Sequence, residues 1–344
     1  MPEHELAPIT APAAAFESSA PTRRPTADTA LDVALLRDPG DTVAPTADLF
    51  RSPGFFRLHA GTFARAWYAT ALDASTGMPI ASSWFAEVAP GEVRSGARGP
   101  FGGYHSAYSP LPIVLATRLV AATEDELRAR DLRTVKVTLP PAAYEEESHA
   151  EWMNVYLRQG YRAAPPDLNY HSWVGDEPLA DRMNSGNRAV VRSAERKGMF
   201  ARVLRANERA DAYAVNVQNR QRRGRPMTMT LDALLAMDQA LPGTLHWFGV
   251  YRREQMIAAS VCMRVAPHAL YVFYLGEVDG VERLSPVTLL VSHIHDWCRD
   301  HQIAFLDLGI ATEGGLPNEG LMAYKRNLGF DVSPKYTLQK ELGL

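Results

Sequence analysis

Arginine is concentrated in one stretch of the chain, residues 184–225. Arg188, Arg192 and Arg196 are spaced four residues apart, so a helix capped by Ser185 places all three on one face. Guanidinium groups bind phosphate oxygens, so this basic face is typical of a site for a phosphate-bearing ligand, either a nucleotide-containing donor or RNA. A solvated helix face that pairs with acids elsewhere has the same pattern, and both interpretations stay open.

A second stretch, residues 94–108, is dense in glycine and carries Tyr104, His105 and Tyr108. Glycine allows positive φ and a close approach of the backbone to a ligand, so these three side chains are candidates for lining an acceptor pocket. A surface loop that needs tight turns and packs its aromatic side chains has the same composition.

His293 and His295 suggest a metal site at first sight, together with Asp296. Two histidines two residues apart on a helix point to different faces, so they do not share an ion. We therefore predict no metal.

Composition limits the class of protein. Of the 344 residues, 46% are hydrophobic and 22% charged, which is typical of a packed globular protein. A net charge of −3 gives no overall attraction to nucleic acid or membranes, so such a partner needs a local basic patch. Cys262 and Cys298 lie in apolar segments as expected of buried thiols, and no apolar run spans a membrane or begins a secretion signal. We expect a cytoplasmic protein without a membrane partner.

The elements that position these residues follow from hydrophobic periodicity. Residues 63–72 and 79–88 are β-rich runs on either side of a turn, and helical spacing after Pro112 precedes a strand at 134–139 and a helix that closes at Gly160. For residues 269–344 the periodicity then predicts a strand, a helix, a strand, a helix and a strand, in that order. Both halves of the chain therefore end in the same order of elements.

This recurrence predicts a duplicated α/β unit. The layout of residues 157–173 matches that of 327–340, with a helix end, Gly-aromatic, a short strand, proline and a further strand. We predict domains at 46–180 and 181–344, each with a mixed central sheet flanked by helices. Residues 1–45 are rich in Ala, Pro, Thr and Ser without a period, which predicts a disordered arm.

Several motifs together resemble a known family. They are the Arg-rich segment 184–198, the glycine-rich loop, Tyr274-Leu275-Gly276, residues 284–290, Asp307-Leu308-Gly309 and residues 318–330. Their order resembles the GCN5-related N-acyltransferase (GNAT) fold, and the chain from roughly residue 50 to 342 resembles the double-GNAT acyltransferases related to the FemAB peptidyltransferases.

The resemblance implies where a site lies. GNAT domains carry an Asn, a Tyr seven residues later and a Gly-Phe pair four residues further on; here Asn318 and Gly329-Phe330 match, and Lys325 replaces the Tyr. A lysine is found there in FemAB-like relatives, where it can steady an oxyanion or a phosphate. A solvated lysine near a helix C-terminus is the other interpretation.

The same fold implies that the fourth and fifth strands splay. The backbone of Tyr274, Leu275 and Gly276 then faces the acyl carbonyl, and the candidate proton acceptors are Asp307 and Glu277. Asp307 can equally be a turn or cap residue.

The donor is the main open question. The usual pyrophosphate-binding glycine loop is replaced by residues 277–286, although Ser285 followed by Pro286 still starts a helix with free amides for an anion. We predict an N-acyltransferase that moves an acyl group from acyl-CoA to an amine of a small-molecule or amino-acid-like acceptor. The alternatives are a FemAB-like transferase that uses aminoacyl-tRNA, with tRNA as partner, and a non-catalytic binding protein.

Overall fold

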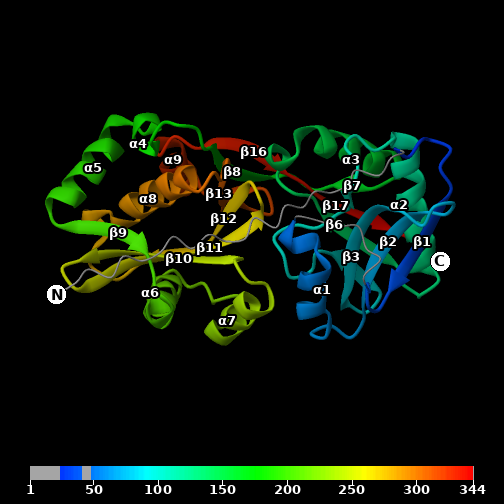
Figure 1. The fold of residues 1–344 in the computed structure, drawn as a ribbon, viewed down its shortest axis with the longest axis horizontal. Coiled ribbons are helices and arrows are strands. Elements are labelled where there is room, and N and C mark those ends of the chain that lie inside the picture. Colours follow the sequence, from blue (N-terminus) through cyan, green and yellow to red (C-terminus); the bar gives the residue numbers. More distant parts are fainter. Residues whose placement is uncertain (1–23, 41–47, 344) are drawn as a thin grey trace.

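The computed structural model describes residues 24–40 and 48–343, which form two lobes side by side (Figure 1). The first lobe is a mixed sheet with helices α1 to α3, and the second lobe is a mixed sheet with helices α4 to α9. The helices are α1 Pro53–Ala60, α2 Ile113–Arg128, α3 Glu146–Arg158, α4 Leu179–Arg182, α5 Ser185–Arg196, α6 Arg209–Arg222, α7 Leu231–Ala240, α8 Pro286–Asp300 and α9 Glu319–Asn327. The predicted class, two helix-flanked α/β units, is confirmed.

The first sheet has the order β1-β2-β3-β4-β6-β17-β7, with β5 paired to β3. Its strands are β1 Leu31–Leu36, β2 Ala66–Asp73, β3 Pro79–Ala89, β4 Glu92–Ser95, β5 His105–Ser106, β6 Thr134–Thr138, β7 Arg162–Ala163 and β17 Thr337–Glu341. The predicted hairpin is β2–β3, in which Gly77 takes a φ of +70° to close the turn. The strand β1 lies inside the predicted disordered arm and pairs with β2 through alternating apolar residues, so that prediction is wrong for residues 31–36. Residues 1–23 lie outside the described part.

The second sheet has the order β16-β8-β13-β12-β11-β10-β9. Its strands are β8 Asp167–Trp173, β9 Met199–Val203, β10 Leu245–Arg252, β11 Gln255–Ala266, β12 Ala269–Glu277, β13 Phe305–Ile310 and β16 Asp331–Lys335, with β14 Thr312–Glu313 and β15 Leu316–Pro317 as a separate ribbon. Side chains of β11 alternate between two cores, because Ala258 and Cys262 pack with α8 whereas Ala259 and Val261 pack with α6. Both cysteines are buried free thiols, as predicted.

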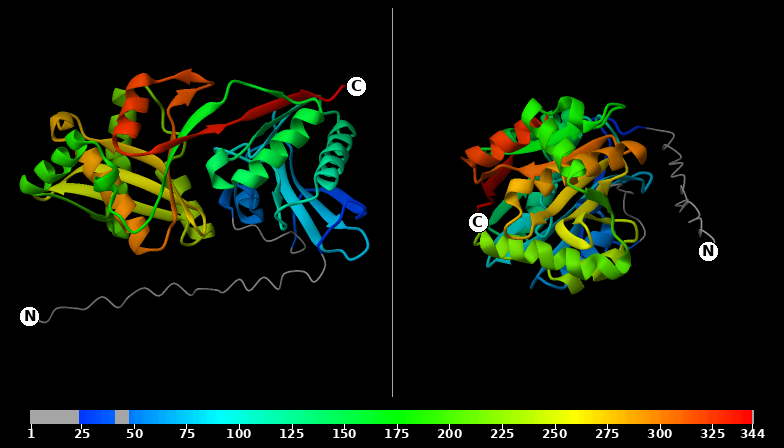
Figure 2. Two further views of the ribbon diagram at one scale, coloured as in Figure 1. Left: turned by 90° about the horizontal axis from the view of Figure 1, so that it is seen from above. Right: turned by 90° about the vertical axis from the view of Figure 1, so that its left-hand side faces the viewer.

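The two lobes exchange strands. The strand β8 lies before the predicted boundary at residue 180 but pairs with β13 and β16 in the second sheet. The strand β17 lies at the end of the chain but pairs with β6 in the first sheet, and Figure 2 shows it reaching across to that lobe. The sheets therefore do not divide the chain at residue 180.

An apolar core joins the lobes. Tyr144 ends a short 3₁₀ turn, Ala142–Tyr144, and its ring lies 4.7 Å from that of Phe305 in β13, between centroids. Phe50 and Trp84 of the first lobe belong to the same buried cluster as Val261 of the second. This shared core holds the ends of both sheets against each other, which brings polar side chains of the two lobes into one site.

Candidate active site

The strands β12 and β13 separate at Asp307. They pair in parallel from Ala269 with Phe305 to Tyr271 with Asp307, and no later pair joins them. Beyond Asp307, Gly309 takes a φ of +75° and the pairing of β13 with β8 shifts register. The predicted splay of these two strands is therefore present, and Asp307 marks its start.

Asp307 is buried, with 2% of its surface exposed, and it accepts hydrogen bonds from three parts of the chain. The Tyr144 hydroxyl donates to Oδ2 at 2.7 Å, while Asn169 Nδ2 and the Gly309 amide donate to Oδ1 at 2.8 and 2.7 Å. Burial and the negative charge of Asp307 raise the pKa of Tyr144 well above its ordinary value, so the phenol stays protonated as the donor. These bonds fix the direction of the carboxylate.

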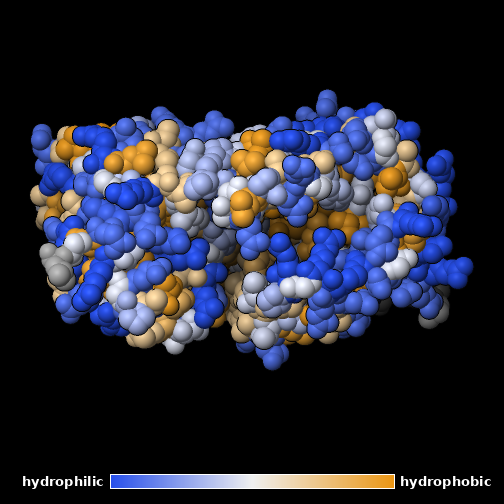
Figure 3. All heavy atoms as spheres, turned by 180° about the vertical axis from the view of Figure 1, so that it is seen from behind, coloured by the Kyte–Doolittle hydropathy of each residue, from blue (hydrophilic) through white to orange (hydrophobic). Residues whose placement is uncertain are grey.

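Asp307 lines a cavity of about 300 Å³ between the lobes. The first lobe contributes β4, β6 and the loop before β5, and the second contributes β8, β12, β13 and the β16–β17 connection. The lining residues are Arg94, Pro100, Phe101, Thr138, Pro141, Asp167, Asn169, Tyr271, Asp307, Gly309, Ile310, Lys335 and Thr337. Figure 3 shows in addition a hollow with a hydrophobic floor on the rear face of the second lobe, close to the groove between the lobes.

Lys325 is buried behind this cavity, with 4% of its surface exposed, so the solvated interpretation is wrong. Its ammonium group donates to the carbonyl oxygens of Leu308, Gly309 and Ile310 at 2.8, 2.8 and 2.9 Å. Burial lowers its pKa to about 7, and the charge of Asp307 opposes that shift. All three N–H groups are used by the backbone of β13, so Lys325 holds the strand end that carries Asp307.

Glu277, the other candidate proton acceptor, lies away from the cavity at the end of β12. Its carboxylate is 3.9 Å from the guanidinium of Arg222, and burial together with Glu282 raises its pKa. Arg222 in turn pairs with Asp279 and Glu282. The structure thus places the two candidate acids in different surroundings, with only Asp307 facing the cavity.

The predicted donor-binding residues lie along the splay. The Tyr274 hydroxyl accepts from the amides of Thr228 and Met229, and so fixes the α6–α7 loop. Gly276 packs against Asn219 of α6, where a Cβ would approach the Asn219 Cβ to 2.8 Å. Leu275 lies between these two residues in β12.

Two further residues predicted to bind the donor, Ser285 and Asn318, stand at the starts of helices α8 and α9. Ser285 precedes α8 in a left-handed conformation, with a φ of +51°, and its side chain makes no capping hydrogen bond to the helix. Asn318 caps α9 by accepting from the Leu321 amide at 3.0 Å.

The glycine-rich loop is built into the first lobe. The Gly102 amide donates to Thr138 O at 2.7 Å and the Gly103 amide to Ser95 Oγ at 2.8 Å, so the loop fills the gap between the ends of β4 and β6. A Cβ at Gly102 would lie 2.6 Å from the Gly96 nitrogen.

The aromatic side chains of this loop pack inside the first lobe. Tyr104 is buried and stacks on Trp152 with 5.6 Å between ring centroids. His105 and Tyr108 follow it in and after β5. None of the three lines the cavity at Asp307, which is lined by Pro100 and Phe101 of the same loop instead.

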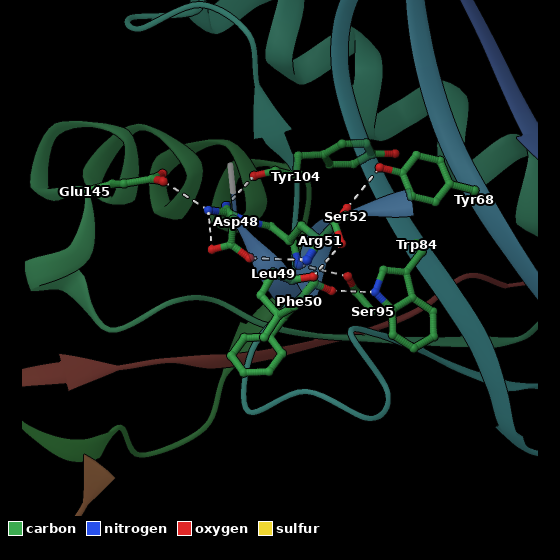
Figure 4. Close-up of polar contacts among 11 residues, drawn as sticks. Asp48, Leu49, Phe50, Arg51, Ser52, Tyr68, Trp84, Ser95, Tyr104 and Glu145 are labelled. Atoms are coloured by element: carbon green, nitrogen blue, oxygen red, sulfur yellow. Dashed lines mark hydrogen bonds and ion pairs between the residues drawn. The ribbon is translucent and has the colours of Figure 1, made fainter. Parts of the chain in front are cut away.

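A buried arginine holds the segment next to Tyr144 (Figure 4). Arg51 donates to Tyr104 O at 3.1 Å and pairs with Asp48 at 3.2 Å and Glu145 at 2.9 Å. Because Glu145 directly follows Tyr144, this ion pair anchors the turn that presents the phenol to Asp307. Sequence reasoning missed Tyr144 and Asn169, and no spacing in the chain connects them to Asp307.

The arginine-rich segment lies on the outer helix of the second lobe. Asn184, not Ser185, caps α5, because its side chain accepts from the Asn187 amide at 2.8 Å. Arg188 donates to Met183 O, and Arg192 is exposed. Neither lines the cavity at Asp307.

Comparison with known proteins agrees with this fold. The family described as an acetyltransferase (GNAT) domain matches residues 180–326. The structure of FemX aligns with a TM-score of 0.65 at 12% identity, over 86% of this chain and 92% of that one. The structure of L-PGS from Bacillus licheniformis aligns with a TM-score of 0.54 at 14% identity, over 75% of this chain and 80% of that one. The structure of a tandem GNAT protein from the clavulanic acid biosynthesis pathway aligns with a TM-score of 0.51 at 13% identity, over 92% of this chain and 99% of that one. No curated protein sequence matches the chain.

The second half of the chain, residues 180–326, therefore matches the acetyltransferase (GNAT) domain family. Over most of its length the chain also shares the fold of FemX and of that tandem GNAT protein. No helix in the described residues is both long and apolar enough to cross a membrane. The described residues also hold no group of three His, Cys, Asp or Glu side chains placed to share a metal ion.

Proposed function

We propose that this chain transfers an acyl group to the amine of an acceptor bound in the cavity between the lobes, with Asp307 as the group that takes up the amine's proton. The observation that carries the proposal is the buried Asp307 carboxylate at the point where β12 and β13 separate, held by Tyr144, Asn169 and Gly309 beside an open cavity. An acceptor amine must be neutral to attack, so a fixed carboxylate next to it serves as its base.

The reaction balances with one proton transferred. The amine nitrogen forms a bond to the acyl carbon, the bond from that carbon to the leaving sulfur or oxygen breaks, and the amine's proton passes through Asp307 to solvent. The leaving thiolate or alkoxide takes a proton from solvent. Lys325 keeps the carbonyl groups of residues 308–310 in place during this sequence and is a positioning residue in this proposal.

Acyl-CoA is the donor in our leading form of the proposal. The helix α8 connects β12 to β13, and no side chain caps its start at Ser285 and Pro286, where a helix N-terminus favours an anion. A thermal-shift titration with CoA, acetyl-CoA and longer acyl-CoAs tests it, because a donor that binds the folded state raises the melting temperature. Absence of stabilisation and of turnover with every one of them would overturn this form.

An aminoacyl-tRNA donor is the second form, and two observations favour it. The exposed Arg192 lies on the outer helix α5, and one solved structure with this fold, at a TM-score of 0.57 and 12% identity, is described as a domain of a putative lysylphosphatidylglycerol synthetase. Binding of tRNA that falls steeply with salt and weakens on Arg188→Glu and Arg192→Glu supports this form. Binding that neither salt nor these changes affects would overturn it.

A further inference from the structure

Two cations line the cavity between the lobes without a protein partner. Arg94 extends from β4 of the first lobe and Lys335 ends β16 of the second. Within residues 24–40 and 48–343 neither side chain makes an ion pair or a hydrogen bond, and the Nε atom of Arg94 is buried without an acceptor. Burial and the nearby Arg94 lower the pKa of Lys335, while Asp307 and Asp167 oppose this shift. Asp307 and Asp167 thus act on Lys335 through space and not by direct contact, which leaves the donor groups of both cations available to an anion in the cavity.

Two carboxylates line the same cavity. Asp307 is held by its three donors, and Asp167 accepts from the Thr312 hydroxyl at 2.7 Å and the Gly315 amide at 3.1 Å. Lys335 stands opposite Asp167 in the β8–β16 register, yet no ion pair within 4.0 Å joins the cations to the carboxylates in the described residues. The cavity thus keeps two positive and two negative groups apart around one space.

Neutral hydrogen-bonding groups complete the wall beside the cations. The hydroxyls of Thr138 and Thr337 lie 3.1 Å apart where β6 pairs with β17, and both residues line the cavity. Hydroxyls beside a guanidinium and an ammonium group form a set of donors suited to carboxylate or phosphate oxygens. Asp307 lies in the same wall at the end of the splay, where an acceptor amine is needed.

From this arrangement we infer that the acceptor is zwitterionic: its anionic group, a carboxylate or a phosphate, binds between Arg94 and Lys335 while its amine lies at Asp307. This inference rests on the proposed function for the role of the amine, and it narrows the acceptor to amines that also carry an acidic group. Simple amines, including polyamines without an acid, are excluded as efficient acceptors because they leave both cations uncompensated.

Binding to the full chain without any donor tests this inference separately from turnover. The probes for isothermal titration calorimetry at low salt are β-alanine and phosphoethanolamine as zwitterions, propylamine as the amine alone, and propionate and inorganic phosphate as the anions alone. We expect at least one zwitterion to bind at least ten-fold more tightly than propylamine, and the preference between β-alanine and phosphoethanolamine identifies the acidic group.

Matched variants locate the site. Arg94→Ala and Lys335→Met should each weaken zwitterion binding ten-fold or more, Lys335→Arg should restore most of it, and Asp307→Asn should remove the advantage of a zwitterion over its anion alone. Arg98→Ala, an exposed cation near the same loop, is the control and should change nothing. Melting temperatures of all variants establish that they are folded.

Zwitterions that bind no better than propylamine, or that do not bind at all, would overturn the inference. An equal loss in the Arg98→Ala control would overturn it as well. Failure of every acyl donor to give turnover, with zwitterion binding intact and dependent on Arg94 and Lys335, would overturn the proposed function and leave the anion site standing.

Discussion

Tyr144 and Asp307 lie 163 residues apart in the chain and share a hydrogen bond of 2.7 Å across the boundary between the lobes. The donor stands on a turn anchored by the Arg51–Glu145 ion pair, and the acceptor stands where β12 and β13 separate. The first lobe therefore supports the carboxylate of the second, in addition to lining the cavity. This contact gives a structural reason for a site that depends on both copies of the duplicated fold.

The Tyr144 contact makes a first prediction. Tyr144→Phe removes one donor from a buried carboxylate, which should lower the free energy of unfolding by about 1–3 kcal/mol and reduce turnover. Urea denaturation and a donor-saturated rate measure the two effects. Tyr156→Phe is the matched control, because the Tyr156 hydroxyl is buried without a hydrogen-bond partner in the described residues, and its loss should be neutral or stabilising. Equal losses in both variants would contradict the role given to Tyr144.

The two acids in and near the splay make a second prediction. Asp307→Asn keeps the size of the side chain but removes its charge, and should lower kcat by about 100-fold or more if Asp307 is the base. Glu277→Gln should stay within about three-fold of the parent, since Glu277 faces Arg222 and not the cavity. Steady-state kinetics with a fixed donor and acceptor compares them. A greater loss in Glu277→Gln would move the base to the end of β12.

Lys325 makes a prediction about pH. Its pKa is lowered to about 7 in the folded chain, against an ordinary value of 10.5 when unfolded. Between these values the unfolded state binds more protons, so the free energy of unfolding rises with pH from about 7 towards about 10. The Lys325→Met variant has no amine that titrates at this position. The free energy of unfolding of the parent should therefore rise relative to that of the variant as the pH increases from 6 to 9.

Urea denaturation at several pH values gives that difference. A difference that does not change with pH would mean that the three carbonyl contacts keep the folded pKa of Lys325 near its ordinary value. The positioning role would then rest on a permanently charged ammonium group.

The glycine-rich loop makes a prediction about sterics. Gly102→Ala places a Cβ 2.6 Å from the Gly96 nitrogen and 2.7 Å from the Ser95 carbonyl carbon, and backbone atoms move less easily than side chains. We expect a loss of about 1–3 kcal/mol in the free energy of unfolding. Gly175→Ala, where no atom lies within 4 Å of the added Cβ, should have little effect. A tolerated Gly102→Ala would contradict the packed conformation of the loop.

The sequence predicted what depends on local pattern and missed what depends on contacts between distant segments. The β2–β3 hairpin, α2 and the β12–α8–β13 order follow from periodicity and turn residues. Asp307 was found through the family resemblance, although it lies inside β13 and not at its end. Tyr144 and Asn169 were missed because they reach Asp307 from other elements. Arg94 and Lys335 were missed because a single cation in a strand has no signal until folding brings a second beside it.

The strand exchange was missed for a related reason. A short strand such as β17 has the same alternation whichever sheet it joins, so its partners β6 and β7 are decided by tertiary packing. For Lys325 the sequence indicated its place in the motif but not its burial. A lysine near a helix end has the same sequence pattern whether its amine reaches solvent or three buried carbonyl groups.

The exchanged strand β17 makes the last prediction. Leu338 is fully buried in the core of the first lobe and pairs with Val137 of β6. In the chain, however, β17 directly follows β16, which belongs to the sheet of the second lobe. Leu338→Ala should therefore cost about 2–5 kcal/mol and should speed amide hydrogen exchange in β6 and α2 of the first lobe. Gln339→Ala, on the exposed side of the same strand, should cost less than about 0.5 kcal/mol. Faster exchange confined to β8 and β16 would contradict the exchange of strands between the lobes.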